Sequence, residues 1–205
     1  DRVYVVYLSD TLGCHSSKAM AIDAPTAGEE FGSAVAAIGD VNGDGVRDIA
    51  IGATGASDAA NQFGAVYIAL LREYPVDTPS EMHKIFPGSN GFGGATTDTF
   101  SHFGASIAFA EKVNEATHLV VSSPGHDSLT GAFYHLFLDA GVQVYSEKFV
   151  DETETGALPA GNNFGTGLAV LNVDDNGVVD LAASTTNGRV FVMQHEAPAC
   201  GDSTV

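Results

Sequence analysis

A Phe-Gly pair that recurs along the chain constrains the fold more than any other feature of this sequence. The pairs begin at Phe31, Phe103 and Phe164. Each is followed by an apolar run, a tight polar loop, a second apolar run, a Gly-containing turn and a third run rich in Val, Tyr and Phe. These side chains pack well on a pleated surface, and no segment holds a capped helical stripe for long. Self-similar units of this kind indicate a repeat architecture, so we expect a nearly all-β chain.

The repeats also predict boundaries within a single segment that spans residues 1–205. A fourth strand fits before each following Phe-Gly pair, which gives complete units at 31–88 and 103–150. Residues 1–24 match the third and fourth strands of a unit, and residues 164–196 match the first three strands of another. We therefore expect about three and a half units, each complete one a four-stranded antiparallel sheet.

The composition narrows the classes of function. The 205 residues include 26 acidic and 8 basic ones, for a formal net charge of −18. Nucleic acids and anionic membrane surfaces both select a basic face, so neither is an expected partner. No apolar run reaches the length of a membrane span, so we expect no membrane insertion. Asp1 shows neither an initiator Met nor a signal-peptide pattern, and we interpret the chain as a processed product, an excised piece or the ordered part of a longer protein.

The loop in the first unit has the residue pattern of a calcium cage. Oxygen ligands alternate along it, with a backbone carbonyl at the fourth position: Asp40, Asn42, Asp44, Val46 and Asp48. The start matches an EF-hand loop, but the twelfth position is Ile51 where an EF-hand has Glu. The alternative is an acidic turn held by Asx hydrogen bonds, in which three close carboxylates would repel one another without a cation. We therefore expect calcium, which takes six to eight oxygen ligands, and disfavour magnesium, which demands tighter octahedral geometry.

The third unit repeats this scheme and the second unit does not. The corresponding ligands of the third unit are Asn172, Asp174, Asn176, Val178 and Asp180. In the second unit, at 110–118, Ala110 and Lys112 stand where ligands should be and His118 replaces the closing aspartate. We therefore expect two calcium sites, the third-unit one weaker because it has one carboxylate fewer, and none in the 110–118 loop.

Taken together, these features resemble FG-GAP repeats, the blades of integrin α-chain-type β-propellers. The resemblance rests on the Phe-Gly pairs, the acidic loops, the "GATGA" and "SSPGH" segments where the family has Gly-Ala-Pro, and strands such as "GAVYI". It implies radially arranged four-stranded blades, calcium at the acidic loops, and an extracellular, secreted or cell-surface setting. A propeller of this family closes with about seven blades. This chain is therefore a fragment, half of a two-chain ring or an unusual small closure.

Partners are expected at two places. An open arc exposes sheet edges at 1–8 and 189–194, and exposed edges invite pairing, so we expect another chain or a missing segment to cover them. The resemblance also implies a protein or glycan ligand on the face opposite the calcium loops. The segments that match this face are 26–30, 55–62, 89–102, 125–130 and 151–163. Phe92 and Phe100, in the third of these, are either exposed contact residues or side chains packed onto their own blade.

The predicted function is therefore calcium-supported adhesion or protein–protein assembly. It does not include catalysis, because no nucleophile elbow, Walker loop, dinucleotide-binding or zincin motif occurs. The alternatives are a carbohydrate-binding accessory module of a secreted enzyme, a structural filament subunit and a stand-alone enzyme. Cys14 and Cys200 occupy equivalent places in their units. They are disulfide candidates within or between chains, or else two free thiols.

Overall fold

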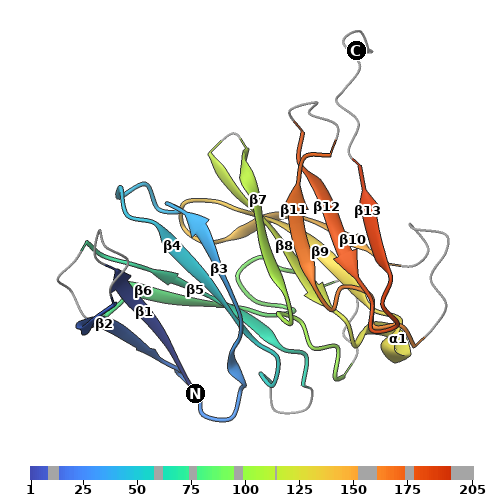
Figure 1. Ribbon diagram of the computed structural model, residues 1–205, viewed down its shortest axis with the longest axis horizontal. Coiled ribbons are helices and arrows are strands. Elements are labelled where there is room, and N and C mark those ends of the chain that lie inside the picture. Colours follow the sequence, from blue (N-terminus) through green and yellow to red (C-terminus); the bar gives the residue numbers. More distant parts are fainter. Residues whose placement is uncertain are drawn as a thin grey trace, which may run out of the picture.

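The computed structural model describes residues 1–8, 14–57, 62–73, 78–94, 99–113, 115–151, 161–173 and 178–194. Its regular structure is almost entirely β, with one short helix among the described residues (Figure 1). The prediction of a nearly all-β chain made of four-stranded antiparallel sheets is therefore confirmed. No helix of the described part is long and apolar enough to cross a membrane.

Four antiparallel sheets follow one another along the chain. The first pairs β1 (Arg2–Leu8) with β2 (Cys14–Asp23). The second runs in the order β3 (Phe31–Gly39), β4 (Asp48–Ala53), β5 (Ala65–Leu70) and β6 (Glu81–Ile85). The third runs in the order β7 (Ile107–Val113), β8 (Ala116–Ser123), β9 (Ala132–Leu138) and β10 (Val144–Val150). The fourth contains β11 (Leu168–Leu171), β12 (Asp180–Ser184) and β13 (Val190–Met193).

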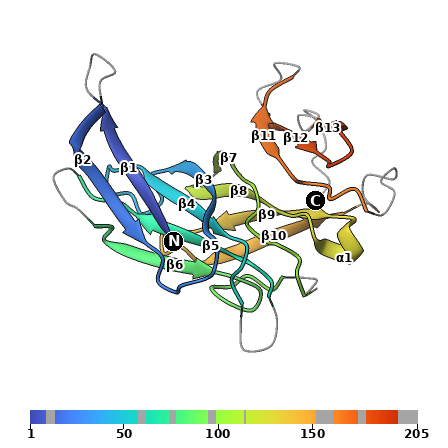
Figure 2. The same cartoon turned by 60° about the horizontal axis from the view of Figure 1, so that its bottom comes forward.

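The sheets are arranged as partial propeller blades. The first strands of consecutive sheets contact one another, β3 with β7 and β7 with β11, and the later strands fan outward from them (Figures 1 and 2). The loop between β3 and β4 lies at the upper edge of Figure 1, and the helix α1 (His126–Leu129) lies at the lower edge. The molecule therefore has two distinct loop faces, which we call the β3–β4 loop face and the α1 face.

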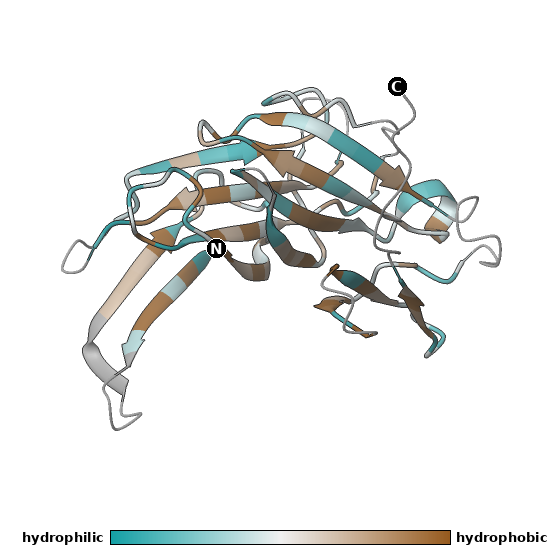
Figure 3. Cartoon of the chain, turned by 90° about the horizontal axis from the view of Figure 1, so that it is seen from above, coloured by the Kyte–Doolittle hydropathy of each residue, from teal (hydrophilic) through white to brown (hydrophobic). Residues whose placement is uncertain are grey.

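The hydrophobic core lies between the sheets. One buried cluster joins the first and second sheets, a second joins the second and third, and a third joins the third and fourth. Figure 3 shows hydrophobic residues concentrated on the strands. The largest fully buried side chains of these clusters include Met20, Ile51, Phe92, Phe103, Leu119, Phe133 and Phe164. Each sheet is thus stabilised by apolar surface that it shares with its neighbours.

The Phe-Gly pairs connect each sheet to the preceding one. Phe103 is buried, and its N–H donates to the carbonyl of Phe63 at 2.8 Å, forming a parallel bridge between Phe103 and Gly64. Phe164 forms the same bridge with Gly131. Gly64 has a φ of +86°, and a Cβ there would lie 2.2 Å from the Phe103 oxygen. Glycine is therefore required at this close approach of two backbones.

The helix α1 is a local exception to the all-β fold. It spans four residues, and Asp127 and Ser128 have positive φ values of 42° and 54° rather than helical ones. The turn closes because the N–H of Gly131 donates to the carbonyl of His126 at 3.0 Å. It lies in the segment 125–130 that the sequence assigned to a loop, so it shapes that loop without adding a layer to the fold.

Candidate metal loops and ligand-binding face

The β3–β4 loop is organised by its first aspartate. Asp40 Oδ1 accepts the N–H groups of Gly43 at 2.7 Å and Asp44 at 3.1 Å, and Oδ2 accepts that of Gly45 at 2.8 Å. These hydrogen bonds, the one from Gly45 above all, lower the pKa of the Asp40 carboxyl. The arrangement is that of an Asx turn, so the backbone of the loop is curled around one carboxylate.

The next two predicted ligands bond to each other. Asn42 Nδ2 donates to Asp44 Oδ2 at 3.0 Å, and the Asp44 N–H donates to Asn42 Oδ1 at 3.0 Å. Val46 donates its N–H to Asp44 Oδ1 at 2.8 Å. Each carboxylate oxygen has two lone pairs, so these bonds leave acceptor capacity on Asp44 for a further partner.

Asp48 lies beneath the loop and is fully buried. Its Oδ2 accepts the N–H of Val41 at 2.8 Å, and its Oδ1 accepts that of Leu71 at 2.9 Å. Burial raises the pKa of the Asp48 carboxyl, and the charges of Asp44 and Asp40 add to this effect. Asp48 thus joins the start of the loop to the end of β5, and it is repelled by the charges of the two other carboxylates.

The donor set of this loop fits a hard cation in its chemistry. It offers carboxylate, amide and carbonyl oxygens, which are the ligands that calcium takes. None of the ion pairs among the described residues involves its three aspartates. The same described residues contain no group of three or more His, Cys, Asp or Glu side chains placed to hold a metal ion. The loop therefore has suitable ligands that are engaged in internal hydrogen bonds, and the calcium site stays a prediction.

The third-unit loop repeats the buried aspartate. Asp180 is fully buried, and its Oδ2 accepts the N–H of Val173 at 2.7 Å, which mirrors the bond between Asp48 and Val41. Asn172 is exposed and Val178 is half-buried. Asp174 and Asn176 lie outside the described residues, so the structure brings together only part of this predicted ligand set.

In the second-unit loop, the residues that replace predicted metal ligands make other contacts. Lys112 reaches across to the first-unit loop and donates from Nζ to the carbonyl of Asp40 at 2.8 Å. His118 lies 2.9 Å, between Nε2 and Nδ1, from His135, and its ring stacks on Phe137 at a centroid distance of 4.4 Å. No local pattern predicts the imidazole pair, because His135 lies on the neighbouring strand β9 and only the β8–β9 register brings it near His118.

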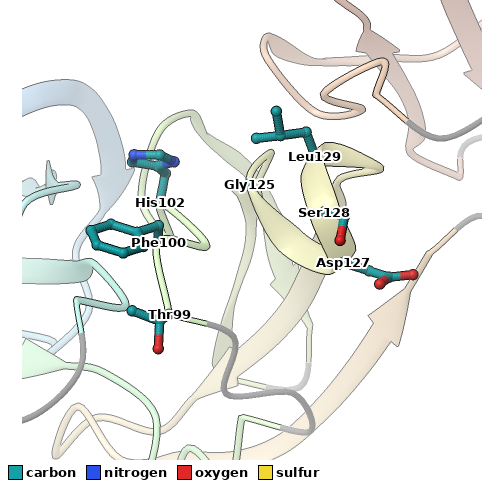
Figure 4. Close-up of a pocket in the computed structure, with 7 residues that line it drawn as sticks. All are labelled: Thr99, Phe100, His102, Gly125, Asp127, Ser128 and Leu129. Atoms are coloured by element: carbon teal, nitrogen blue, oxygen red, sulfur yellow. The ribbon is translucent and has the colours of Figure 1, made fainter.

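The two phenylalanines of the 89–102 segment have different environments. Phe92 is fully buried between Phe103 and Tyr134, at centroid distances of 5.0 and 5.1 Å. Phe100 is 58% exposed and lines a cavity of about 370 Å³. The opposite wall of the cavity is made by Gly125 and by the α1 residues Asp127 to Leu129 (Figure 4). Two segments predicted for the ligand face therefore lie on either side of one cavity.

A partly buried ion pair holds the 26–30 segment of the α1 face. Glu29 is buried and accepts a hydrogen bond from Lys84 Nζ on β6 at 2.6 Å. The hydroxyl of Tyr67 donates to the other oxygen of Glu29. Burial, followed by the bond and charge of Glu29, raises the pKa of Tyr67. Sequence reasoning missed this cluster, because its members are far apart in the chain and share no motif.

Some predicted residues lie outside the described part of the chain. These are Cys200 and parts of the expected ligand-face segments, namely 58–61, 95–98 and 152–160. Cys14 begins β2. The pairing of Cys14 with Cys200 stays a prediction.

Comparisons with known proteins agree with this architecture. The family model "FG-GAP repeat" matches residues 31–68, which run from the start of β3 into β5. Integrin alpha-3 from Cricetulus griseus is 23% identical to this chain over 193 residues. That match covers 93% of this chain and 17% of the integrin, so the chain spans about a sixth of the length of this relative.

Proposed function

Starting from a chain that carries an FG-GAP repeat of the integrin type, we propose that it is a calcium-stabilised, extracellular propeller segment for adhesion or protein assembly. The observation that carries the proposal is the β3–β4 loop, in which Asp40, Asn42 and Asp44 are hydrogen-bonded within one tight turn that ends at the buried Asp48. The integrin similarity supports a non-catalytic role and a cell-surface setting.

Calcium in this loop would neutralise repulsion among carboxylates. Asp40, Asp44 and Asp48 interact closely enough for the first two to raise the pKa of the third. A bound cation would be held by these carboxylates, by the amide oxygen of Asn42 and by the carbonyl of Val46. The role would be structural, since Asp48 also fixes the end of β5 through Leu71.

A thermal melt in calcium and in EGTA tests this role. With free calcium at a hundredfold excess over its Kd, the folded state gains about 2.7 kcal/mol. For a chain of this size that gain raises the Tm by roughly 5–10 °C. Asp44→Asn should remove most of the shift, whereas Asp127→Asn, on the α1 face, should leave it unchanged. Equal melting in calcium and EGTA for the unmodified chain would refute the proposal.

Assembly is supported by apolar residues on the outermost sheets. Tyr4 and Val6 of β1 are 60% and 45% exposed, and Val190 and Val192 of β13 are 66% and 49% exposed. We propose that further blades or another chain cover these sheets. Val190→Lys with Val192→Lys should abolish any concentration-dependent association seen in sedimentation velocity. Association that survives this double variant would place the contact elsewhere.

A further inference from the structure

The cavity on the α1 face combines apolar and polar side chains. Phe100 and Leu129 are large apolar residues that are 58% and 47% exposed at its rim. Its polar lining residues are Thr99, His102, Asp127 and Ser128. Its volume of about 370 Å³ falls within the range typical of small-molecule sites. The cavity can therefore offer both an apolar platform and several hydrogen-bonding groups to one ligand.

Both walls of the cavity are fixed to the fold through backbone hydrogen bonds. The N–H of Phe100 donates to the carbonyl of Gln62 at 2.7 Å, which ties this wall to the preceding sheet. The carbonyl of Leu129 accepts the N–H of Asn163 at 2.7 Å, which ties the other wall to the segment leading into the next sheet. A wall held in this way loses little freedom when a ligand binds, so the site is pre-organised.

Backbone strain is concentrated at this cavity. Ten non-glycine residues of the described chain have positive φ, and five of them line it: Phe100, His102, Asp127, Ser128 and Leu129. Such conformations cost free energy and gather at ligand clamps and active sites. Here they aim an aromatic ring and an aliphatic side chain toward solvent, where each loses the stabilisation that burial would give.

The lining narrows the chemistry of the ligand. It contains neither Lys nor Arg, and the chain carries a net charge of −18, so phosphorylated and sulfated ligands are disfavoured. A compact cation would need the ring of Phe100 and the carboxylate of Asp127 to converge. Figure 4 instead shows them on opposite walls, with the carboxylate directed away from the ring.

We infer that this cavity binds a neutral saccharide. A sugar ring presents a C–H face that packs on an aromatic ring, and hydroxyl groups that both donate and accept hydrogen bonds. The exposed Phe100 matches the first, and the hydroxyl and imidazole groups of the lining match the second. The inference deepens the proposed function, since it gives the α1 face a ligand class, and it does not depend on calcium.

The test uses the full chain and saturation-transfer NMR with five neutral probes: lactose, maltotriose, cellotriose, mannotriose and N,N′,N″-triacetylchitotriose. At least one probe should bind with one-to-one stoichiometry by calorimetry. Phe100→Ala should weaken that binding about tenfold or more, as expected for loss of an aromatic anchor. Tyr145→Ala is the matched control, because Tyr145 on β10 is 60% exposed and lies outside the cavity.

His102→Asn is a second variant, which replaces a residue with a φ of 55° by one tolerant of positive φ, and it should weaken binding several-fold while leaving the melt unchanged. Binding of Nα-acetyl-arginine amide in place of the sugars, or no binding by any probe, would overturn the inference. So would equal losses in the Phe100→Ala and Tyr145→Ala chains. Because the melt in calcium and EGTA is recorded separately, failure of the metal proposal is distinguished from failure of the saccharide site.

Discussion

Replacement of Asp48 by alanine tests whether the β3–β4 loop is held by hydrogen bonds as well as by a cation. Asp48 is fully buried, and its two oxygens accept the N–H groups of Val41 and Leu71, which are themselves buried. Asp48→Ala leaves two buried donors without an acceptor, at about 1–3 kcal/mol each. Relief of the cost of burying the carboxylate offsets part of this loss, so we expect the free energy of unfolding to fall by about 3 kcal/mol.

Urea denaturation in EGTA measures this loss without a contribution from calcium. Asp48→Asn should cost about half as much, because it keeps one acceptor oxygen and places an NH₂ group against the other N–H. Asp44→Ala is the matched control in the same loop. Asp44 is exposed, so this variant should change the free energy of unfolding in EGTA by no more than about 0.5 kcal/mol. If Asp48→Ala is as mild as Asp44→Ala in EGTA, the reasoning from buried donors is wrong.

Three further predictions address the core, the contact between sheets and the buried tyrosine. Phe92→Ala should lower the free energy of unfolding by about 3–5 kcal/mol in urea, and a loss under about 1 kcal/mol would contradict its buried position. Gly64→Ala should lower the free energy of unfolding by at least about 2 kcal/mol, because its Cβ would meet Phe103. Gly43 has a similar φ but open space around it, so Gly43→Ala should lower this free energy by only about 1 kcal/mol. Thermal melts of the two variants make the comparison. The pKa of Tyr67 is raised in the folded state, so the unfolded chain loses this proton first and the free energy of unfolding falls above about pH 10. Tyr67→Phe should flatten this decline in urea midpoints measured at rising pH. An unchanged slope would contradict the assignment of the decline to Tyr67.

The sequence predicted the features that depend on local pattern. Alternation of apolar residues and tight turns placed β3 and β4 on either side of the 40–48 loop, and the structure ends β3 at Gly39 and begins β4 at Asp48. The recurrence of Phe-Gly indicated repeats. Both signals are carried by neighbours in the chain, which is why they can be read without coordinates.

Contacts between distant segments could not be predicted in this way. The sequence marked Phe103 as a repeat position, but its bridge to Gly64 depends on how two sheets meet. Glu29, in the turn before β3, forms an ion pair with Lys84 on β6, and nothing near either residue indicates the other. Lys112 occupies a position where the other units have a predicted metal ligand. Its ammonium group instead donates a hydrogen bond to the neighbouring β3–β4 loop. Each of these depends on register and on packing between sheets, which residue spacing does not encode.

Each hydrophobic cluster lies between two adjacent sheets. A cluster therefore needs residues from two repeats, and one repeat of the sequence does not contain a complete core. Strands β3 to β6, from Phe31 to Ile85, form one sheet, but its two apolar faces belong to two different clusters. Excised alone, it would expose both faces to water, so a pair of adjacent sheets is the smallest piece expected to fold. Insertion or loss of a repeat brings together sheets that were not neighbours before. It is therefore tolerated only where the apolar faces of these new neighbours are complementary. Selection on such a chain acts on the interface between adjacent repeats. The Phe-Gly pairs at Phe103 and Phe164 belong to this interface, because each forms a β-bridge with the preceding repeat.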